Sequence, residues 1–148
     1  MSADPETIFD VLSDPDSYGE WVVGSREIRD ADSDWPAVGS RFHHTVGIGG
    51  PFTISDNTQV EGIERPRFLQ LRARARPLGT ALVTLELERA DGGTHVTMVE
   101  DPADTFTALI FNPLVHLLTR RRNEESLRRL ERLARERSET AAAAAGVA

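Results

Sequence analysis

The chain has 148 residues, a formal net charge of −7 and no cysteine. This length suits one compact domain, and a hydrophobic content of 39% is enough to build a core. The lack of cysteine excludes disulfides, thiolate metal sites and thiol nucleophiles. All 17 basic residues are arginine, which also excludes lysine Schiff bases.

Targeting signals are scarce. The segment 1–6 lacks the basic and apolar regions of a secretory leader, and the uncharged run 105–119 is shorter than the roughly 20 apolar residues of a membrane span. The arginines of 120–137 alternate with glutamates, which is typical of a solvated helix face rather than a nucleic-acid surface. We therefore expect a cytoplasmic protein without a nucleic-acid partner.

Two short helices are predicted at the start of the chain. Asp4 and Asp14 each precede a proline, and this order of capping aspartate and proline at the first helical position is typical of a helix start. The second helix ends at about Trp21.

Turn residues then recur about every ten positions, which predicts an antiparallel sheet. The expected strands are 22–31, 38–48, 53–63, 67–76, 80–89 and 94–101. Alternating apolar and polar residues give the sheet one dry and one wet face. On the wet face, Arg72, Arg74 and Arg76 are expected to pair with Glu86 and Glu88.

A third helix is predicted from Pro113, capped by Asn112, to about Ser138, so that 1–138 is a single domain and 139–148 a frayed, alanine-rich tail. One stripe of this helix carries His116, Thr119, Asn123, Leu127, Leu130 and Ala134. Each unpaired buried polar group costs about 1–3 kcal/mol, so the polar end of the stripe favours a polar pocket or ligand. The small inward residues of the sheet, Ala73, Ala75 and Ala81, either leave room for a cavity or make way for Trp21, Trp35 or Phe42.

Several motifs resemble the polyketide cyclase/dehydrase and lipid-transport branch of the START-like (SRPBCC) superfamily. They are 4–15 followed by Tyr18 and Trp21, then 38–42, 60–67, 93–97 and 123–127. The resemblance covers roughly residues 3–135, and its motifs are mostly structural. It implies an α+β helix-grip fold, in which a curved antiparallel sheet wraps around a long C-terminal helix and two short N-terminal helices precede the sheet. Such a fold encloses an apolar cavity for a small hydrophobic ligand.

The sequence departs from this family at its start. Members usually begin with a strand before the first helix, whereas only Met1, Ser2 and Ala3 precede Asp4 here. The sheet is then expected to have six strands and one exposed edge. Either the start is truncated relative to the natural protein, or another subunit covers the edge as in a homodimer.

Candidate site residues follow from strand alternation. If Phe42 points inward, so does His44, and the same rule brings Asp56, Thr58 and Glu100 inward. We take His44, Asp56 and Glu100 as candidate acid/base groups. The candidate ligand-binding residues are Trp21, Phe42, Thr58, Ala73, Met98, His116 and Asn123. His44, Asp56 and Thr58 could instead lie near strand ends or at a bulge, where they would meet water. Glu100 could instead be the structural partner of an arginine such as Arg41.

No metal or cofactor is expected, because the four histidines lack a metal-binding spacing and the chain has no thiols. The leading functional hypothesis is binding of a polyketide-like or lipid-like molecule in an internal cavity. One alternative is a polyketide cyclase or dehydratase, and another is a protein-interaction module of the same fold. We interpret the apolar segment 105–118 as a lid over the cavity, with Phe106, Leu109, Ile110 and Phe111 as its apolar residues. This segment and the adjacent Arg120–Arg122 could instead dock on an anionic membrane, but the net charge of −7 disfavours that interpretation.

Overall fold

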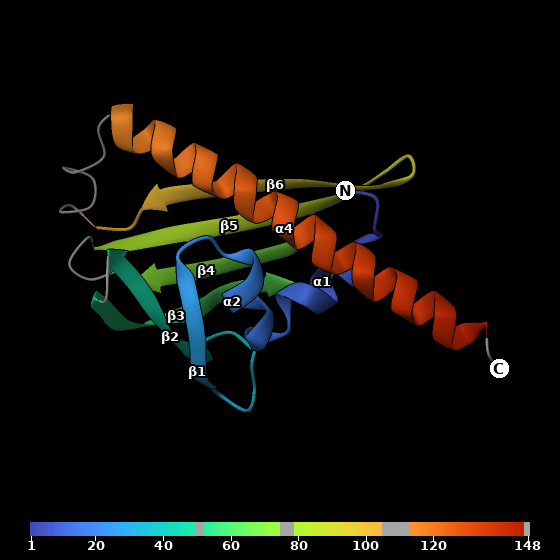
Figure 1. Cartoon of the computed structure of the whole chain (residues 1–148), viewed down its shortest axis with the longest axis horizontal. Helices are drawn as coiled ribbons and strands as arrows, with labels where there is room; N and C mark the ends of the chain where they lie inside the picture. The colour runs from blue at the N-terminus through green and yellow to red at the C-terminus, as the bar shows by residue number, and fades with distance from the viewer. Residues whose placement is uncertain (50–51, 75–78, 105–112, 147–148) are drawn as a thin grey trace.

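A computed structural model describes residues 1–49, 52–74, 79–104 and 113–146. Its antiparallel sheet has six strands in chain order: β1 Ser25–Ala31, β2 Arg41–Gly49, β3 Phe52–Glu64, β4 Phe68–Arg74, β5 Thr80–Ala90 and β6 Gly93–Pro102. The long helix α4, Pro113–Ala145, crosses one face of the sheet (Figure 1). The short helices α1 (Pro5–Leu12), η1 (Pro15–Ser17) and α2 (Tyr18–Trp21) precede the sheet, and α1 and α2 pack against α4. The expected helix-grip architecture is confirmed.

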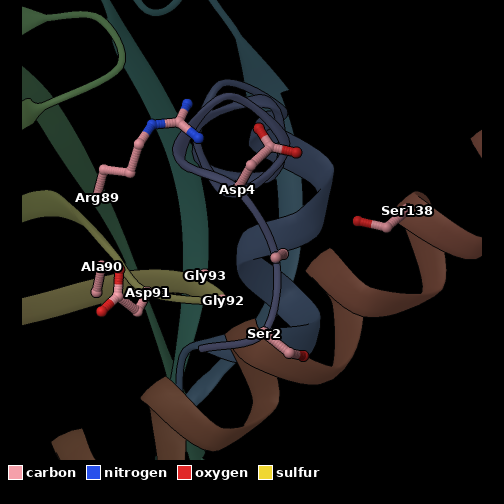
Figure 2. A pocket seen from close by; sticks show the side chains of 9 residues that line it. Ser2, Asp4, Arg89, Ala90, Asp91, Gly92, Gly93 and Ser138 are labelled. Carbon is pink, nitrogen blue, oxygen red and sulfur yellow. The ribbon is translucent and has the colours of Figure 1, made fainter.

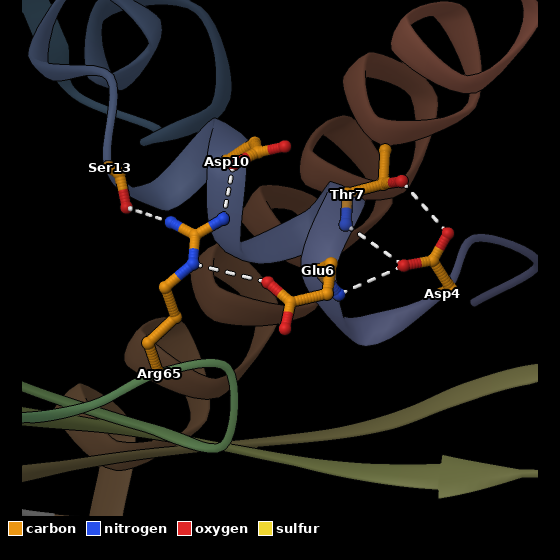
Figure 3. Close-up of polar contacts among 6 residues, drawn as sticks. All are labelled: Asp4, Glu6, Thr7, Asp10, Ser13 and Arg65. Carbon is orange, nitrogen blue, oxygen red and sulfur yellow. Dashed lines mark hydrogen bonds and ion pairs between the residues drawn. The ribbon is translucent and has the colours of Figure 1, made fainter. Parts of the chain in front are cut away.

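Both predicted helix starts are present. The Asp4 carboxylate accepts hydrogen bonds from the backbone N–H groups of Glu6 (3.0 Å) and Thr7 (3.1 Å) at the start of α1 (Figure 3). Asp14 caps η1 in the same way by accepting from the N–H of Asp16. These caps satisfy N–H groups that have no partner within the helix.

Arg65, in the turn between β3 and β4, ties the sheet to α1. Its Nε donates to Glu6 at 3.1 Å, and its other nitrogens reach Asp10 and Ser13 (Figure 3). The guanidinium also lies over the Phe9 ring, 5.4 Å from its centroid. These contacts attach α1 to the end of the sheet that carries the β3–β4 turn.

The core lies between the inner face of the sheet and the middle of α4. Fully or almost fully buried apolar side chains come from α1, α4 and the central strands: Ile8, Phe9, Val11, Leu12, Val60, Leu69, Leu71, Leu85, Leu87, Leu130 and Ala134. Burying one such large side chain stabilises the fold by about 1.5–3 kcal/mol. The predicted stripe on the last helix is therefore confirmed at Leu130 and Ala134, whereas Leu117 and Leu118, nearer its N-terminus, are exposed.

The last helix is longer than predicted. It continues through the alanine-rich segment to Ala145 instead of ending at about Ser138. Alanine has the highest helix propensity, so the helix can continue there without burial. The hydroxyls of Ser138 and Thr140 donate to the carbonyls of Ala134 and Glu136 four residues earlier. Residues 139–145 therefore belong to the helix, and fraying of this segment stays a prediction.

One predicted set of cross-strand pairs is also wrong. The β4–β5 register places Glu86 opposite Phe68, so Arg72 has Leu82 as its neighbour. The Arg72 side chain turns to the other adjacent strand and pairs with Glu61 of β3 at 2.6 Å. Alternation fixes the face of a strand residue, but it leaves the register open.

None of the helices among the described residues combines the length and the apolar composition that a membrane span requires.

Candidate functional site

His44 and Asp56 form the centre of the candidate site. They are direct partners in the β2–β3 ladder, and their residues are only 7% and 2% exposed. Residues that face each other in an antiparallel ladder point to the same side of the sheet. Both side chains therefore lie on the inner face, in the orientation that strand alternation predicts.

The surroundings of His44 favour a neutral imidazole. Burial lowers the pKa of His44 below its ordinary value of 6.5, and nearby Arg29 and His43 lower it further, while the Asp56 carboxylate acts in the opposite direction. The buried Nδ1 atom of His44 has no hydrogen-bond partner among the described residues. Asp56 is oriented in part by its own strand, because its Oδ1 accepts from the N–H of Asn57 at 3.0 Å.

The site continues along the inner face into smaller side chains. Thr58 is buried, and its ladder partners are Phe42 on β2 and Ala73 on β4; Ala73 in turn faces Ala81 on β5. Both alanines are partly exposed, although Leu71, on the same face two residues before Ala73, is buried. This part of the inner face is therefore covered less completely than the core around Leu71.

An aromatic cluster borders the pair. Phe42 lies 5.4 Å from His44 and 4.7 Å from Tyr18, measured between ring centroids, and Trp21 lies 5.0 Å from Tyr18. Trp35 completes the cluster at 4.8 Å from Phe42. The predicted residues Trp21 and Phe42 therefore belong to the aromatic cluster next to His44.

Sequence reasoning missed two members of this cluster as site residues. Tyr18 precedes Trp21 by three positions, which is a same-face spacing on a helix and was a usable signal. Its hydroxyl donates to the Leu12 carbonyl at 2.8 Å, and burial raises the pKa of Tyr18. Trp35 lies between two strands, where no periodic pattern predicts its orientation.

Glu100 lies elsewhere. Its side chain is 10% exposed and accepts hydrogen bonds from Arg122 and from Asn123 Nδ2, the latter at 3.1 Å. The alternative of an arginine partner is therefore seen, but the suggested Arg41 is wrong, because its Nε donates to Gln59. Three strand spacings, roughly 14 Å along the sheet, separate the strand of Glu100 from that of Asp56.

The predicted ligand-binding residues accordingly fall into two groups. Trp21, Phe42, Thr58 and Ala73 belong with His44 and Asp56. The others line an open groove of about 330 Å³ between β6 and the N-terminal half of α4, and its lining includes Met98, Glu100, His116, Asn123 and Leu127. The side chain of His116 is exposed there rather than buried under the helix.

A further open hollow, of about 540 Å³, contains none of the predicted residues. Figure 2 shows it between the N-terminal segment, the β5–β6 hairpin and α4, with Asp4, Arg89, Asp91 and Ser138 at its wall. The residues that line this hollow carry both positive and negative charges, and the hollow is open to solvent. It therefore indicates no particular class of ligand.

Several residues with predicted roles lie outside the described residues. This applies to the cap Asn112, to the predicted lid residues Phe106, Leu109, Ile110 and Phe111, and to Ala75 and Arg76. The side chains of Val46 and Ile48 on β2 and of Ile54 on β3 also lie outside the part that the structure describes. The orientation of His44 and Asp56 is nevertheless fixed by their own burial.

Solved structures with a similar fold come from several bacteria. A protein from Nitrosomonas europaea is 15% identical with a TM-score of 0.71, covering 93% of this chain and 90% of that one. A Mesorhizobium loti protein is 20% identical with a TM-score of 0.67 and 92% coverage of both chains. An AHSA1-like protein from Aeromonas hydrophila is 20% identical with a TM-score of 0.65, covering 93% of this chain and 88% of that one. At these identities the likeness concerns the fold.

The curated proteins contain no significant match to this chain. The family model described as polyketide cyclase / dehydrase and lipid transport, in contrast, matches residues 1–135. That range includes α1, all six strands and the part of α4 that packs on the core. The chain therefore belongs to the polyketide cyclase / dehydrase and lipid transport family of START-like proteins.

Proposed function

We propose that this protein binds a hydrophobic small molecule, polyketide-like or lipid-like, between the inner face of its sheet and α4. Membership in a family described by polyketides and lipid transport supports a ligand of this kind. The observation that carries the proposal is the buried pair His44 and Asp56, which stands beside the small and partly exposed Ala73 and Ala81.

Among the described residues, the inner face offers no hydrogen-bond partner to His44 Nδ1. A buried polar atom without a partner costs about 1–3 kcal/mol, and His44 Nδ1 is such an atom. A ligand that carries a hydroxyl or enol group would donate a hydrogen bond to it, while the ligand's apolar body would fill the space beside the alanines. A small molecule with both features satisfies the site better than hydrocarbon alone.

Native mass spectrometry of the purified protein, followed by organic extraction, tests the proposal. We expect an apolar molecule bound in a 1:1 ratio, or saturable binding of the apolar dye anilinonaphthalene sulfonate by the extracted protein. Ala73→Trp should fill the space and abolish either signal. The matched control is Arg74→Trp, which places the same bulk on the exposed, outer face of the same strand.

Two results would contradict ligand binding at this place. One is a protein that carries no ligand and does not bind the dye. The other is equal binding by the Ala73→Trp and Arg74→Trp variants. Thermal unfolding of both variants shows whether a lost signal reflects a filled site or a lost fold.

The same pair supports a second candidate function, cyclisation or dehydration of a poly-β-keto substrate. A neutral His44 can remove a proton from a carbon between two carbonyl groups, and the C–H electron pair then moves to an enolate oxygen. The enolate carbon attacks a second carbonyl of the same chain, a C–C bond forms, and the new alkoxide takes the proton back from the imidazolium. Asp56, across the ladder, would stabilise the transient positive charge.

Turnover of a poly-β-keto thioester is the direct test of this second function. We expect His44→Ala and Asp56→Asn to lose turnover while they keep the fold and the ability to bind the dye. Glu100→Gln is the control, because Glu100 lies on a different strand beside Arg122 and should leave turnover unchanged. Full activity of both site variants would exclude the acid/base role without affecting the binding proposal.

A further inference from the structure

Four buried side-chain nitrogen or oxygen atoms of the described residues lack a hydrogen-bond partner, and all four come from one part of the chain. They are Trp21 Nε1, Ser25 Oγ, Trp35 Nε1 and His44 Nδ1. Each such atom costs about 1–3 kcal/mol, and folded proteins contain only a few of them per hundred residues. Their concentration between residues 21 and 44 indicates a place where a bound molecule supplies the missing partners.

Ring contacts join three of these residues into one group. Trp35 lies 4.8 Å from Phe42, and Phe42 lies 5.4 Å from His44, measured between ring centroids. Trp21 is connected through Tyr18, which lies 5.0 Å from Trp21 and 4.7 Å from Phe42. The unpartnered nitrogens of the two indoles and of the imidazole therefore belong to a single aromatic cluster.

Ser25 lies on the same face of the sheet as His44. It stands opposite Val46 in the β1–β2 ladder, and His44 precedes Val46 by two residues on β2. The β2–β3 ladder has no register shift between these two positions, so they lie on the same side of the sheet. Residues that face each other across a ladder also share a side, which places Ser25 on the inner face.

The missing partners are mainly hydrogen-bond acceptors. An indole Nε1 carries a hydrogen and can only donate, and a serine hydroxyl has one hydrogen to donate. Tyr18 shows the contrast within the same cluster, because its hydroxyl donates to the Leu12 carbonyl. Among the described residues, no such acceptor serves Trp21, Ser25 or Trp35. A molecule that satisfies these donors must therefore present an atom with free lone pairs.

The charges around the cluster favour a neutral acceptor over an anionic one. Asp56 is 2% exposed and faces His44 directly, so a ligand carboxylate would lie near a second buried carboxyl group. Arg29, whose charge lowers the pKa of His44, is exposed to solvent, which screens that charge. A buried carboxylate without a paired charge is costly. The acceptor that fits is therefore an uncharged oxygen, such as that of a ketone or an ester.

We propose that the protein binds its ligand through a neutral carbonyl group, whose oxygen accepts hydrogen bonds from Trp21 Nε1 and Ser25 Oγ beside His44. This inference rests on the proposed binding of a hydrophobic molecule and specifies the polar group that the molecule carries. Trp21 is 1% exposed, and its helix α2 packs against α4 and against β1, the strand that carries Ser25. Because a carbonyl oxygen has two lone pairs, one oxygen can accept from both donors.

Two probes of matched shape test the carbonyl assignment. Methyl octyl ketone carries the acceptor oxygen, and its alkene analogue replaces that oxygen with a methylene group of similar size. Both affinities are measured by displacement of the neutral dye Nile red, whose own affinity is determined for each variant. Trp21→Phe and Ser25→Ala should each weaken binding of the ketone at least about fivefold and change binding of the alkene by less than about twofold.

Ser40→Ala is the matched control, because Ser40 is buried but its hydroxyl already donates to the Ala37 carbonyl at 2.6 Å. It should leave the affinities of both probes unchanged. Thermal unfolding shows whether Trp21→Phe keeps the fold, and Ser25→Ala tests the same carbonyl contact with a smaller change.

Three results would count against the inference, and they separate it from the binding proposal. Unchanged binding of the ketone in both variants, or equal weakening of ketone and alkene, would overturn the carbonyl contact while hydrophobic binding stands; the first is the result expected if ordered water satisfies the donors. Stronger displacement of the dye by nonanoate than by the ketone would overturn the neutral character of the bound group. If neither probe displaces the dye from the natural protein, the binding proposal fails and this inference fails with it.

Discussion

Asp56 faces His44 across the β2–β3 ladder, and the carboxylate offsets only part of the effect of burial on the imidazole. Burial remains the largest influence, so the pKa of His44 stays below 6.5 in the folded protein. Protonation of this one side chain is thereby coupled to folding.

The first prediction concerns the pH dependence of stability. Because the folded-state pKa of His44 is lowered, the unfolded chain binds more protons once the pH falls toward 6.5. The contribution of neutral His44 to the free energy of unfolding is complete above 6.5 and is lost as the pH falls below it. Urea unfolding between about pH 7.5 and 5.5 should therefore show a smaller loss of stability in His44→Gln than in the natural protein.

Other titrating groups contribute to the same pH range, so a matched histidine variant is needed. His95→Gln, which removes an exposed imidazole from β6, is that matched variant. Equal slopes for all three proteins would mean that His44 does not couple to folding.

The second prediction concerns the attachment of α1 by Arg65. Arg65→Ala removes ion pairs with Glu6 and Asp10 and the contact with Phe9. The Arg65 side chain is 45% exposed, so solvent screening limits the expected loss to about 0.5–1 kcal/mol in urea unfolding. The difference should shrink at about 1 M salt, where the Debye length is near 3 Å.

Arg67→Ala is the control for Arg65, because Arg67 is a neighbouring exposed arginine whose one ion pair within the described part of the chain is with Glu64, three residues earlier. It should change the free energy of unfolding by less than about 0.5 kcal/mol. If the two variants were equally stable, the contacts of Arg65 that Figure 3 draws would not hold α1 to the sheet.

The third prediction concerns the cap of α1. Asp4→Ala removes the acceptor for two backbone N–H groups and the Thr7 hydroxyl, and should cost about 1 kcal/mol. These hydrogen bonds, the Thr7 N–H first, hold the pKa of Asp4 below 3.8. The stabilisation is therefore present above 3.8 and is lost as the pH falls through the lowered folded-state pKa. Asp4→Asn should retain most of the stability at neutral pH, and an Asp4→Asn variant as unstable as Asp4→Ala would argue against capping.

The local features of this fold could be predicted from the sequence because their causes are local. Capping by Asp4 and Asp14 depends on residues two or three positions away. The inward orientation of His44 and Asp56 follows from alternation along a single strand. Each of these predictions required knowledge of one segment only.

Features that depend on how segments meet could not be predicted in the same way. The partner of Glu100 is Arg122 because α4 crosses β6 at that place, and no pattern within either element fixes the crossing point. The pairing of Arg72 with Glu61 depends on strand register, which alternation leaves open. The same limit applies to Glu100 and His44: alternation predicts that both point inward, but it does not show that the sheet holds them on well-separated strands.

The last prediction concerns how α4 is held. Leu130 is fully buried against the sheet, whereas Leu118, three turns earlier on the same helix, is 57% exposed. Leu130→Ala should cost about 2–5 kcal/mol in urea unfolding, since the loss combines burial with the cavity that remains. Leu118→Ala should change stability by less than about 0.5 kcal/mol. Equal effects would mean that Leu118 also anchors the helix, whereas the predicted contrast means that α4 is held at the buried Leu130.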